Sequence, residues 1–147
     1  FNNNSETEKT ISSSGWLRTG DLGYMDRNGY IRVTGRTQEM IIRGGENIYP
    51  KEIENCILEN NAISEVAVIG VPDKIFGEVI ACFLKFNGSY KLGEDELKKF
   101  IRIKLSAQKT PKYWINIEEW PLTASGKIQK FVLREKFLNG EYEREKI

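Results

Sequence analysis

Lys127 lies in the stretch PLTASGKIQK, residues 121–130, among short residues and directly after a glycine. Gly126 can adopt the positive φ values that other residues avoid, so the stretch predicts a small flexible turn with the lysine at its tip. A lysine whose pKa is near the ordinary value is protonated at neutral pH. Such a cation can neutralise negative charge that develops on a phosphate or carboxylate. The alternative is an ordinary solvated turn lysine. A P-loop is excluded, because that motif has a glycine six positions before the lysine and Ser or Thr after it, whereas this chain has Pro121 and Ile128.

Two further charged residues stand beside glycines. Asp21 in LRTGDLG precedes a predicted hairpin, and its carboxylate is suited to accept hydrogen bonds from a diol. Arg36 in VTGRTQE can pair with phosphate or with ribose oxygens. The alternatives are an aspartate that caps its own turn and a surface arginine.

The third candidate is the glycine pair of RGGENIYPKEIE, residues 43–54. Gly44 and Gly45 allow another backbone or a thin ligand to approach closely. The alternative is a plain turn from a strand into a helix that starts at Pro50. Two consecutive glycines exceed what such a turn requires, so the pattern favours a glycine pair that a ligand or another backbone approaches.

Composition excludes several classes of function. The 147 residues amount to one domain, or one domain plus a piece of another, and a formal net charge of +1 argues against a nucleic-acid scaffold. The chain has no histidine, which excludes Ser-His-Asp and Cys-His catalysis and disfavours a protein-ligated zinc site, and no metal-binding residue is expected. No transmembrane segment or signal peptide is expected.

Cys56 and Cys82 lie on apolar patterns without CxxC spacing and predict buried free thiols, with a disulfide as the alternative.

The elements that must position these residues follow from hydrophobic periodicity. Residues 1–15 are polar and predict a loop, and a hairpin with an Asn-Gly turn follows it. We expect Pro72 and Asp73 to turn the chain, and Ile80, Cys82, Leu84 and Phe86 to share one face of a strand. The other predicted strands are 39–43, 66–71 and 113–118, and the predicted helices are 50–60, 93–107 and 130–137. This order indicates an α+β fold, a small mixed β-sheet flanked by helices and preceded by a β-hairpin.

Three motifs in this order resemble the C-terminal end of an AMP-forming adenylating enzyme. That superfamily comprises acyl-CoA synthetases, peptide-synthetase adenylation domains and luciferases. GWLRTGDLGY resembles its TGD motif, GYIRVTGRTQEMIIRGGENIYPKEIE its arginine, hinge and glycine motif, and PLTASGKIQK its terminal lysine motif. The resemblance covers nearly the whole chain, which begins at Phe1 and is expected to be part of a longer protein.

The resemblance implies a role for each motif residue. Asp21 would bind the ribose hydroxyls of ATP, Arg36 the ribose or the phosphates, and Lys127 would bridge the substrate carboxylate and the α-phosphate. The hinge would be Gln38, where many members of the family carry Asp or Lys. The CoA pantetheine tunnel would be lined by Gly44, Gly45 and Glu46.

The same resemblance implies the domain map. Residues 1–37 would be the tail of the large N-terminal adenylating domain, 38–140 the mobile C-terminal domain, and 141–147 a polar tail. The missing N-terminal domain would be the partner of this chain. It would provide most of the ATP-binding surface, the Mg²⁺ site and the pocket for the carboxylic acid, so this chain alone is expected to be inactive.

The motif GGENIYPKEIE resembles the acid–CoA ligases of the superfamily. The expected activity is therefore that of a cytoplasmic, AMP-forming acyl-CoA synthetase of fatty acid metabolism, with ATP and CoA as co-substrates. Two alternatives stay open: an adenylating domain that loads a carrier-protein thiol, and a non-catalytic module that binds CoA or a protein partner.

Overall fold

The computed structural model describes residues 2–88, 91–142 and 147. The chain divides into two compact units, Phe1–Gln38 and Glu39–Ile147, and each contains a β-sheet of its own. Among the described residues, none of the helices has the length and apolar composition of a membrane-spanning segment.

The first unit contains an antiparallel hairpin, as the sequence predicted. The carboxylate of Asp26 accepts the backbone N–H groups of Asn28 and Tyr30 at 2.8 and 3.0 Å, and these bonds hold the turn. Gly29 completes the turn with φ +85°. The elements of this unit are α1 (Asn4–Thr10), β1 (Asp21–Met25) and β2 (Ile31–Arg36).

The prediction of a loop before the hairpin is wrong at Asn4–Thr10, which forms helix α1. Asn3 caps this helix by accepting the N–H of Glu6 at 3.1 Å, and Lys9 pairs with Glu6 at 2.7 Å. The helix buries no residue. Without an apolar stripe it has no hydrophobic period, and capping and ion pairing were the only signals left in its sequence.

The second unit contains the predicted mixed sheet. Its strands lie in the order β4-β3-β6-β5, and β7 also pairs with β6. The β6–β7 pair is parallel and the others are antiparallel. The elements are β3 (Ile41–Arg43), β4 (Glu46–Ile48), α2 (Pro50–Leu58), β5 (Ile63–Asp73), β6 (Gly77–Phe86), α3 (Glu94–Lys104), β7 (Tyr113–Asn116) and α4 (Lys130–Leu138), with 3-10 turns at Thr37–Glu39 and Ala107–Lys109.

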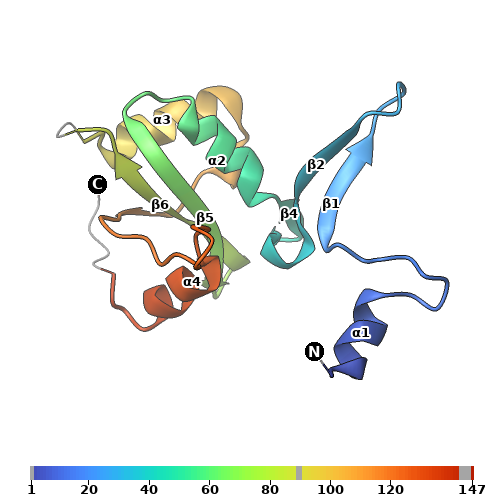
Figure 1. Ribbon diagram of the computed structural model, residues 1–147. Coiled ribbons are helices and arrows are strands. Elements are labelled where there is room, and N and C mark those ends of the chain that lie inside the picture. The colour runs from blue at the N-terminus through green and yellow to red at the C-terminus, as the bar shows by residue number, and fades with distance from the viewer. Residues whose placement is uncertain (1, 89–90, 143–146) are drawn as a thin grey trace. The chain divides into compact units, whose positions relative to one another are not determined.

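Helices cover both faces of this sheet, α2 and α3 on one and α4 on the other (Figure 1). Successive side chains of a strand point to opposite faces, so β6 contributes to two cores. The face predicted from the sequence packs against α2 and α3, and it includes Cys82. Phe83 faces α4. Both cysteines are free and buried, and burial raises the pKa of the Cys82 thiol.

Strand β5 runs longer than predicted, because Pro72 and Asp73 continue it rather than turn the chain. Their cross-strand partners are Glu78 and Gly77. Since β5 lies at an edge of the sheet, it tolerates a proline. The turn to β6 comes after Asp73, whose carboxylate accepts the N–H groups of Ile75 and Phe76 at 2.9 and 3.0 Å.

The last residues contribute to packing where they are described. The ring of Tyr142 lies edge-on to Phe83 at 5.0 Å, and Ile147 packs against the core formed with α2 and α3. The carbonyl of Ile147 also accepts the N–H of Glu94 at the start of α3. Residues 143–146 of the predicted polar tail lie outside the described residues.

We expect Phe83→Ala to lower the free energy of unfolding by about 3 to 5 kcal/mol, because it empties a fully buried ring position. Phe131→Ala is the matched control, since that residue is 69% exposed and the loss of its ring should change stability by about 0.5 kcal/mol or less. Denaturant titrations of the three proteins give the comparison. Equal losses in the two variants would contradict the assignment of the core.

Asp73 makes stability depend on pH. Its hydrogen bond from Lys112, at 2.7 Å, and those from Phe76 and Ile75 lower its pKa from 3.8 to about 2. A carboxyl whose pKa is lower in the folded chain stabilises it above the ordinary pKa, and this contribution is lost as the pH falls through the folded value. The stability difference between the wild type and Asp73→Asn should therefore be larger at pH 6 than at pH 2. A difference that does not change between these pH values would show that the carboxylate is not held in this way.

Candidate functional site

The loop that carries Lys127 is closed by its own backbone. The N–H of Thr123 donates to the carbonyl of Lys127, and the N–H of Gln129 to the carbonyl of Pro121, both at 2.8 Å. Gly126 has φ +79°, as its place at the tip requires. The predicted turn is confirmed as a short hairpin-like loop.

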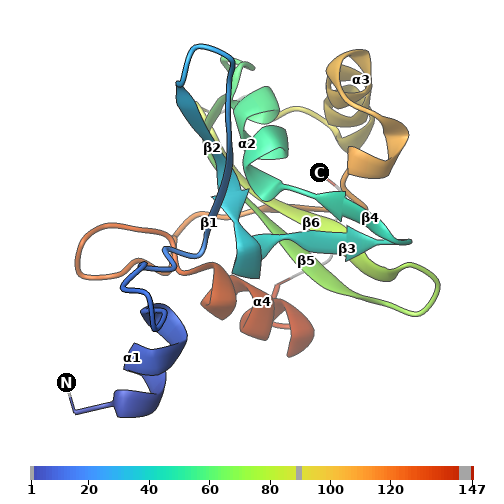
Figure 2. The same ribbon diagram turned by 90° about the vertical axis from the view of Figure 1, so that its right-hand side faces the viewer.

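Small hydroxyl residues complete this loop. The Oγ1 atom of Thr123 accepts the N–H of Lys127 at 3.0 Å and lies 3.0 Å from the Oγ of Ser125. Each of these bonds joins two residues of the loop itself. These bonds hold the tip of the loop, and Ile128 near its end packs against the core on the α4 side of the sheet. The loop projects from the sheet and helices of the second unit (Figure 2).

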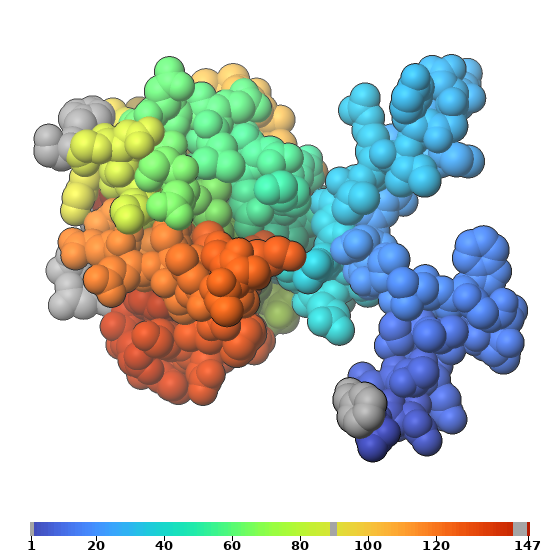
Figure 3. All heavy atoms as spheres, in the orientation of Figure 1, coloured from blue at the N-terminus to red at the C-terminus, as the bar shows by residue number. Residues whose placement is uncertain are grey.

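The side chain of Lys127 is exposed, and it makes no ion pair or hydrogen bond with any residue that the structure describes. The region around residue 120 forms part of the surface of the second unit (Figure 3). The ammonium group is therefore available to an anion from outside the unit. A buried ion pair would have ruled out this role.

The base of the loop is held by Lys130, the first residue of α4, which sequence reasoning did not single out. Its ammonium lies 2.6 Å from Glu39 and 2.8 Å from Glu54. Glu54 is buried, and it also accepts the N–H of Val68 at 3.0 Å. A lysine at the N-terminus of a helix opposes the helix dipole, and that mismatch was the available signal.

Asp21 and Arg36, the predicted ATP ligands, are brought together by the register of the hairpin. They are cross-strand partners at the ends of β1 and β2. The Nε atom of Arg36 lies 3.4 Å from Oδ1 of Asp21, and the side chains are 64% and 39% exposed. A cation and an acceptor thus stand side by side and open to solvent, an arrangement that can contact a phosphate and a diol together.

The predicted hinge residue, Gln38, is the last residue of the first unit. It is exposed and lies in the 3-10 turn Thr37–Glu39. Lys127 belongs to the second unit, whereas Asp21 and Arg36 belong to the first. The three predicted site residues are thus divided between the units, with Gln38 at their boundary.

The glycine pair has a local explanation that the sequence analysis missed. Gly44 and Gly45 have φ +58° and +85°, and they join β3 to β4 as a two-residue hairpin turn. A type I′ turn requires positive φ at both positions, so the statement that two glycines exceed what a turn requires is wrong. Strand β4 (Glu46–Ile48) was not predicted, because three residues are too few to show alternation.

The space at this turn is nevertheless open on one side. No atom lies within 4 Å of a Cβ built on Gly45, whereas one built on Gly44 would lie 3.5 Å from the ring of Phe76. The N–H of Gly44 donates to the carbonyl of Phe76 at 2.8 Å, so the turn is fixed to the β5–β6 turn. Glu46, the third predicted tunnel residue, is exposed.

The basic residues around α3 mostly have acidic partners. Four lysines, on α3 and in the segment that follows it, form ion pairs with Glu94, Glu59, Glu52 and Asp73. These four are Lys98, Lys104, Lys109 and Lys112. Their positive charge is therefore largely offset by these carboxylates. Within the described ranges no group of three or more His, Cys, Asp or Glu side chains could hold a metal ion.

Comparison with known proteins gives a consistent result. The family model described as "AMP-binding enzyme C-terminal domain" matches residues 52–127. The chain is 50% identical over 130 residues to YngI of Bacillus subtilis, which carries the name of an acyl-CoA synthetase, covering 88% of this chain and 24% of that one. It is 44% identical over 130 residues to the medium-chain acyl-CoA ligase ACSF2, mitochondrial, of Rattus norvegicus, covering 88% and 21%.

Solved structures agree with these relatives. The ATP-bound MatB of Rhodopseudomonas palustris matches with a TM-score of 0.86 and 34% identity, over 92% of this chain and 27% of that one. The o-succinylbenzoate CoA synthetase MenE of Bacillus subtilis, in complex with the acyl-adenylate OSB-AMP, matches with a TM-score of 0.83 and 36% identity, over 93% and 27%. The chain thus spans about a quarter of the length of these proteins. The family model, the relatives and the fold confirm the resemblance seen in the three motifs, and the chain belongs to the AMP-binding enzyme C-terminal domain family.

Proposed function

We propose that this chain is the C-terminal part of an ATP-dependent, AMP-forming acid–CoA ligase. The observation that carries the proposal is Lys127, an exposed lysine without a partner among the described residues, on a loop that holds its own shape. The names of the relatives support the acyl-CoA product. The two buried free cysteines support a reducing compartment such as the cytoplasm.

The reaction would proceed in two steps. In the first, a carboxylate oxygen attacks the α-phosphorus of ATP, which forms acyl-AMP and releases pyrophosphate. Two anions must approach each other, so the ammonium of Lys127 between the carboxylate and the α-phosphate would lower the barrier electrostatically. In the second step the thiol of CoA gives up its proton, attacks the acyl carbon and displaces AMP.

Asp21 and Arg36 would bind the nucleotide in this scheme. The carboxylate of Asp21 would accept the ribose hydroxyls, and the guanidinium of Arg36 would contact the ribose or the phosphates. Their adjacency across the hairpin supports a joint role. ATP would bring Mg²⁺ with it, held mainly by the part of the protein outside this chain.

The two steps need different groups beside the acyl carbon. Lys127 would have to enter for the first step and withdraw for the second, and a pivot at Gln38 would permit this motion. The unit boundary after Gln38 supports that position. The open side of the turn at Gly44, Gly45 and Glu46 supports its assignment to the pantetheine tunnel.

In the full-length protein, Lys127→Ala should slow adenylation by about a hundredfold or more, since it removes the cation that bridges the two anions. Thioester formation from supplied acyl-AMP should be largely preserved. Rapid-quench measurement of each half-reaction gives both values, and Lys136→Ala, an exposed lysine of α4, is the control. Equal losses in the two half-reactions, or none, would refute the proposed role.

The 147-residue chain alone should catalyse no pyrophosphate exchange with any carboxylic acid. The acyl pocket and most of the ATP site would lie outside it. An ATP–pyrophosphate exchange assay over a panel of acids, with the full-length protein as the positive control, is the measurement. A clear signal from the short chain would contradict the proposed division of the site.

A further inference from the structure

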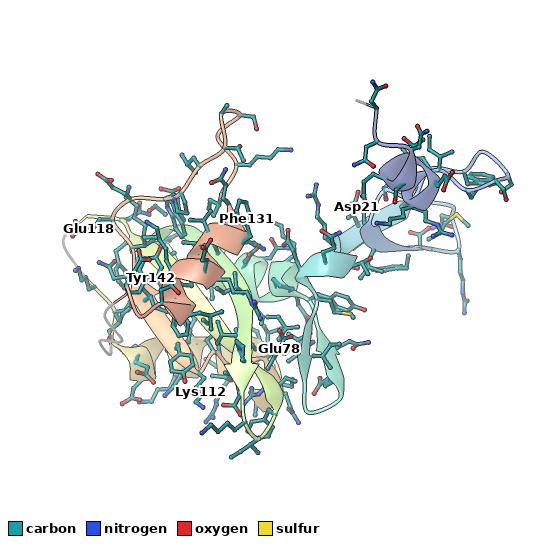
Figure 4. The ribbon with its side chains drawn as sticks, turned by 90° about the horizontal axis from the view of Figure 1, so that it is seen from below. Asp21, Glu78, Lys112, Glu118, Phe131 and Tyr142 are labelled. Atoms are coloured by element: carbon teal, nitrogen blue, oxygen red, sulfur yellow. The ribbon has the colours of Figure 1, made fainter. Side chains whose placement is uncertain are left out.

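Lys130 connects three segments that are far apart in the sequence. Its ammonium lies between the carboxylates of Glu39, which follows Gln38 directly, and Glu54 in α2. The side chains of Lys130, Glu39 and Glu54 are only 21%, 35% and 8% exposed. The lysine itself begins α4, directly after the loop of Lys127, and Figure 4 shows that loop rising beside Phe131 at the start of this helix.

This lysine occupies a position that its own helix disfavours. The N-terminus of a helix carries partial positive charge, and a lysine there is repelled. Partial burial adds a desolvation cost, which an ion pair offsets only with good geometry. Two carboxylates within 2.8 Å of the ammonium meet that condition.

The ion pairs of Lys130 make a short path from the proposed hinge at Gln38 to Lys127. The path runs from Glu39 through the ammonium of Lys130 to the start of α4, and then to the loop through the bond between Gln129 and Pro121. Every step is a hydrogen bond of 2.8 Å or less, or a covalent link. Glu54 fixes the middle of this path to the sheet through Val68.

We propose that Lys130 and Glu39 position Lys127 for adenylation by tying its loop to the first residue after the hinge. This inference rests on the proposed function and adds residues to it. When the second unit turns about Gln38, the link would carry the loop with the pivot at a fixed distance. Without the link, Lys127 would reach the two anions less often, although its own charge would be unchanged.

The sharpest test is Glu39→Gln in the full-length protein. It removes the charge next to the hinge but leaves the buried pair of Lys130 with Glu54, so the fold keeps its inner contact. Glu65→Gln is the matched control, because it makes the same change of charge in an exposed pair with Lys85 at 3.9 Å. Each variant is made in the wild type and in a Lys127→Ala background, and thermal melts check that all remain folded.

We expect Glu39→Gln to lower the adenylation rate about five- to tenfold in the wild type and less than twofold in the Lys127→Ala background, because its effect passes through Lys127. The KM for ATP and the thioester step should change less than twofold. Lys130→Met should reproduce this pattern where it folds, and Lys130→Arg should retain most of the rate. Glu65→Gln should have no effect in either background.

A purely structural pair gives a different pattern. Glu39→Gln would then slow adenylation by the same factor in both backgrounds, or slow both half-reactions together, and the inference would be overturned. A loss below twofold in the wild type would overturn it as well. If Lys127→Ala itself does not slow adenylation, the role proposed for Lys127 fails. If Lys127→Ala does slow adenylation and only the expected pattern of Glu39→Gln is absent, the inference alone fails, so the two failures are distinguishable.

Discussion

Strand β6 is buried on both faces, and the rest of the second unit is arranged around that constraint. Its alternate side chains need two separate apolar layers, which α2 and α3 supply on one side and α4 on the other. A strand buried on both faces must have its backbone groups paired as well, and β5 and β7 flank it. The helices and loops that carry charged groups therefore start from a rigid base.

The charged groups of the proposed site lie on an exposed loop and at strand ends, outside the two cores. Lys127 stands on a loop that is hydrogen-bonded to itself, and Asp21 and Arg36 end the strands of a separate hairpin. Each of these charged side chains is exposed, and hydrogen bonds of the loop or strand pairing hold the backbone beside it. Under the proposed function, such a divided site would be assembled and taken apart by motion at one linker.

Much of the second unit could be predicted because its elements bury apolar residues at regular spacing. The face of β6 with Cys82 and the helix at α3, which buries Leu97 and Ile101, were predicted correctly for this reason. Helix α1 and strand β4 were missed because one buries nothing and the other is three residues long. Without an apolar period, sequence reasoning has only caps and ion pairs to work with.

The same limit separates the site residues that could be predicted from the sequence from those that could not. Lys127, Asp21 and Arg36 stood out through the residue types around them, and the pairing of Asp21 with Arg36 followed from the hairpin register. The ion pairs of Lys130 could not be predicted from the sequence, because Glu39 and Glu54 lie 91 and 76 positions away in the chain. Ion pairs at that separation depend on tertiary packing alone.

The turn at Gly44 and Gly45 has a consequence for selectivity. Both residues need left-handed backbone, so substitution by an L-residue with a side chain is strained at either one. In the proposed tunnel, a molecule that passes Gly45 would meet a residue that has no side chain. Discrimination between ligands at this point would have to rest on main-chain shape, the property that point mutation alters least.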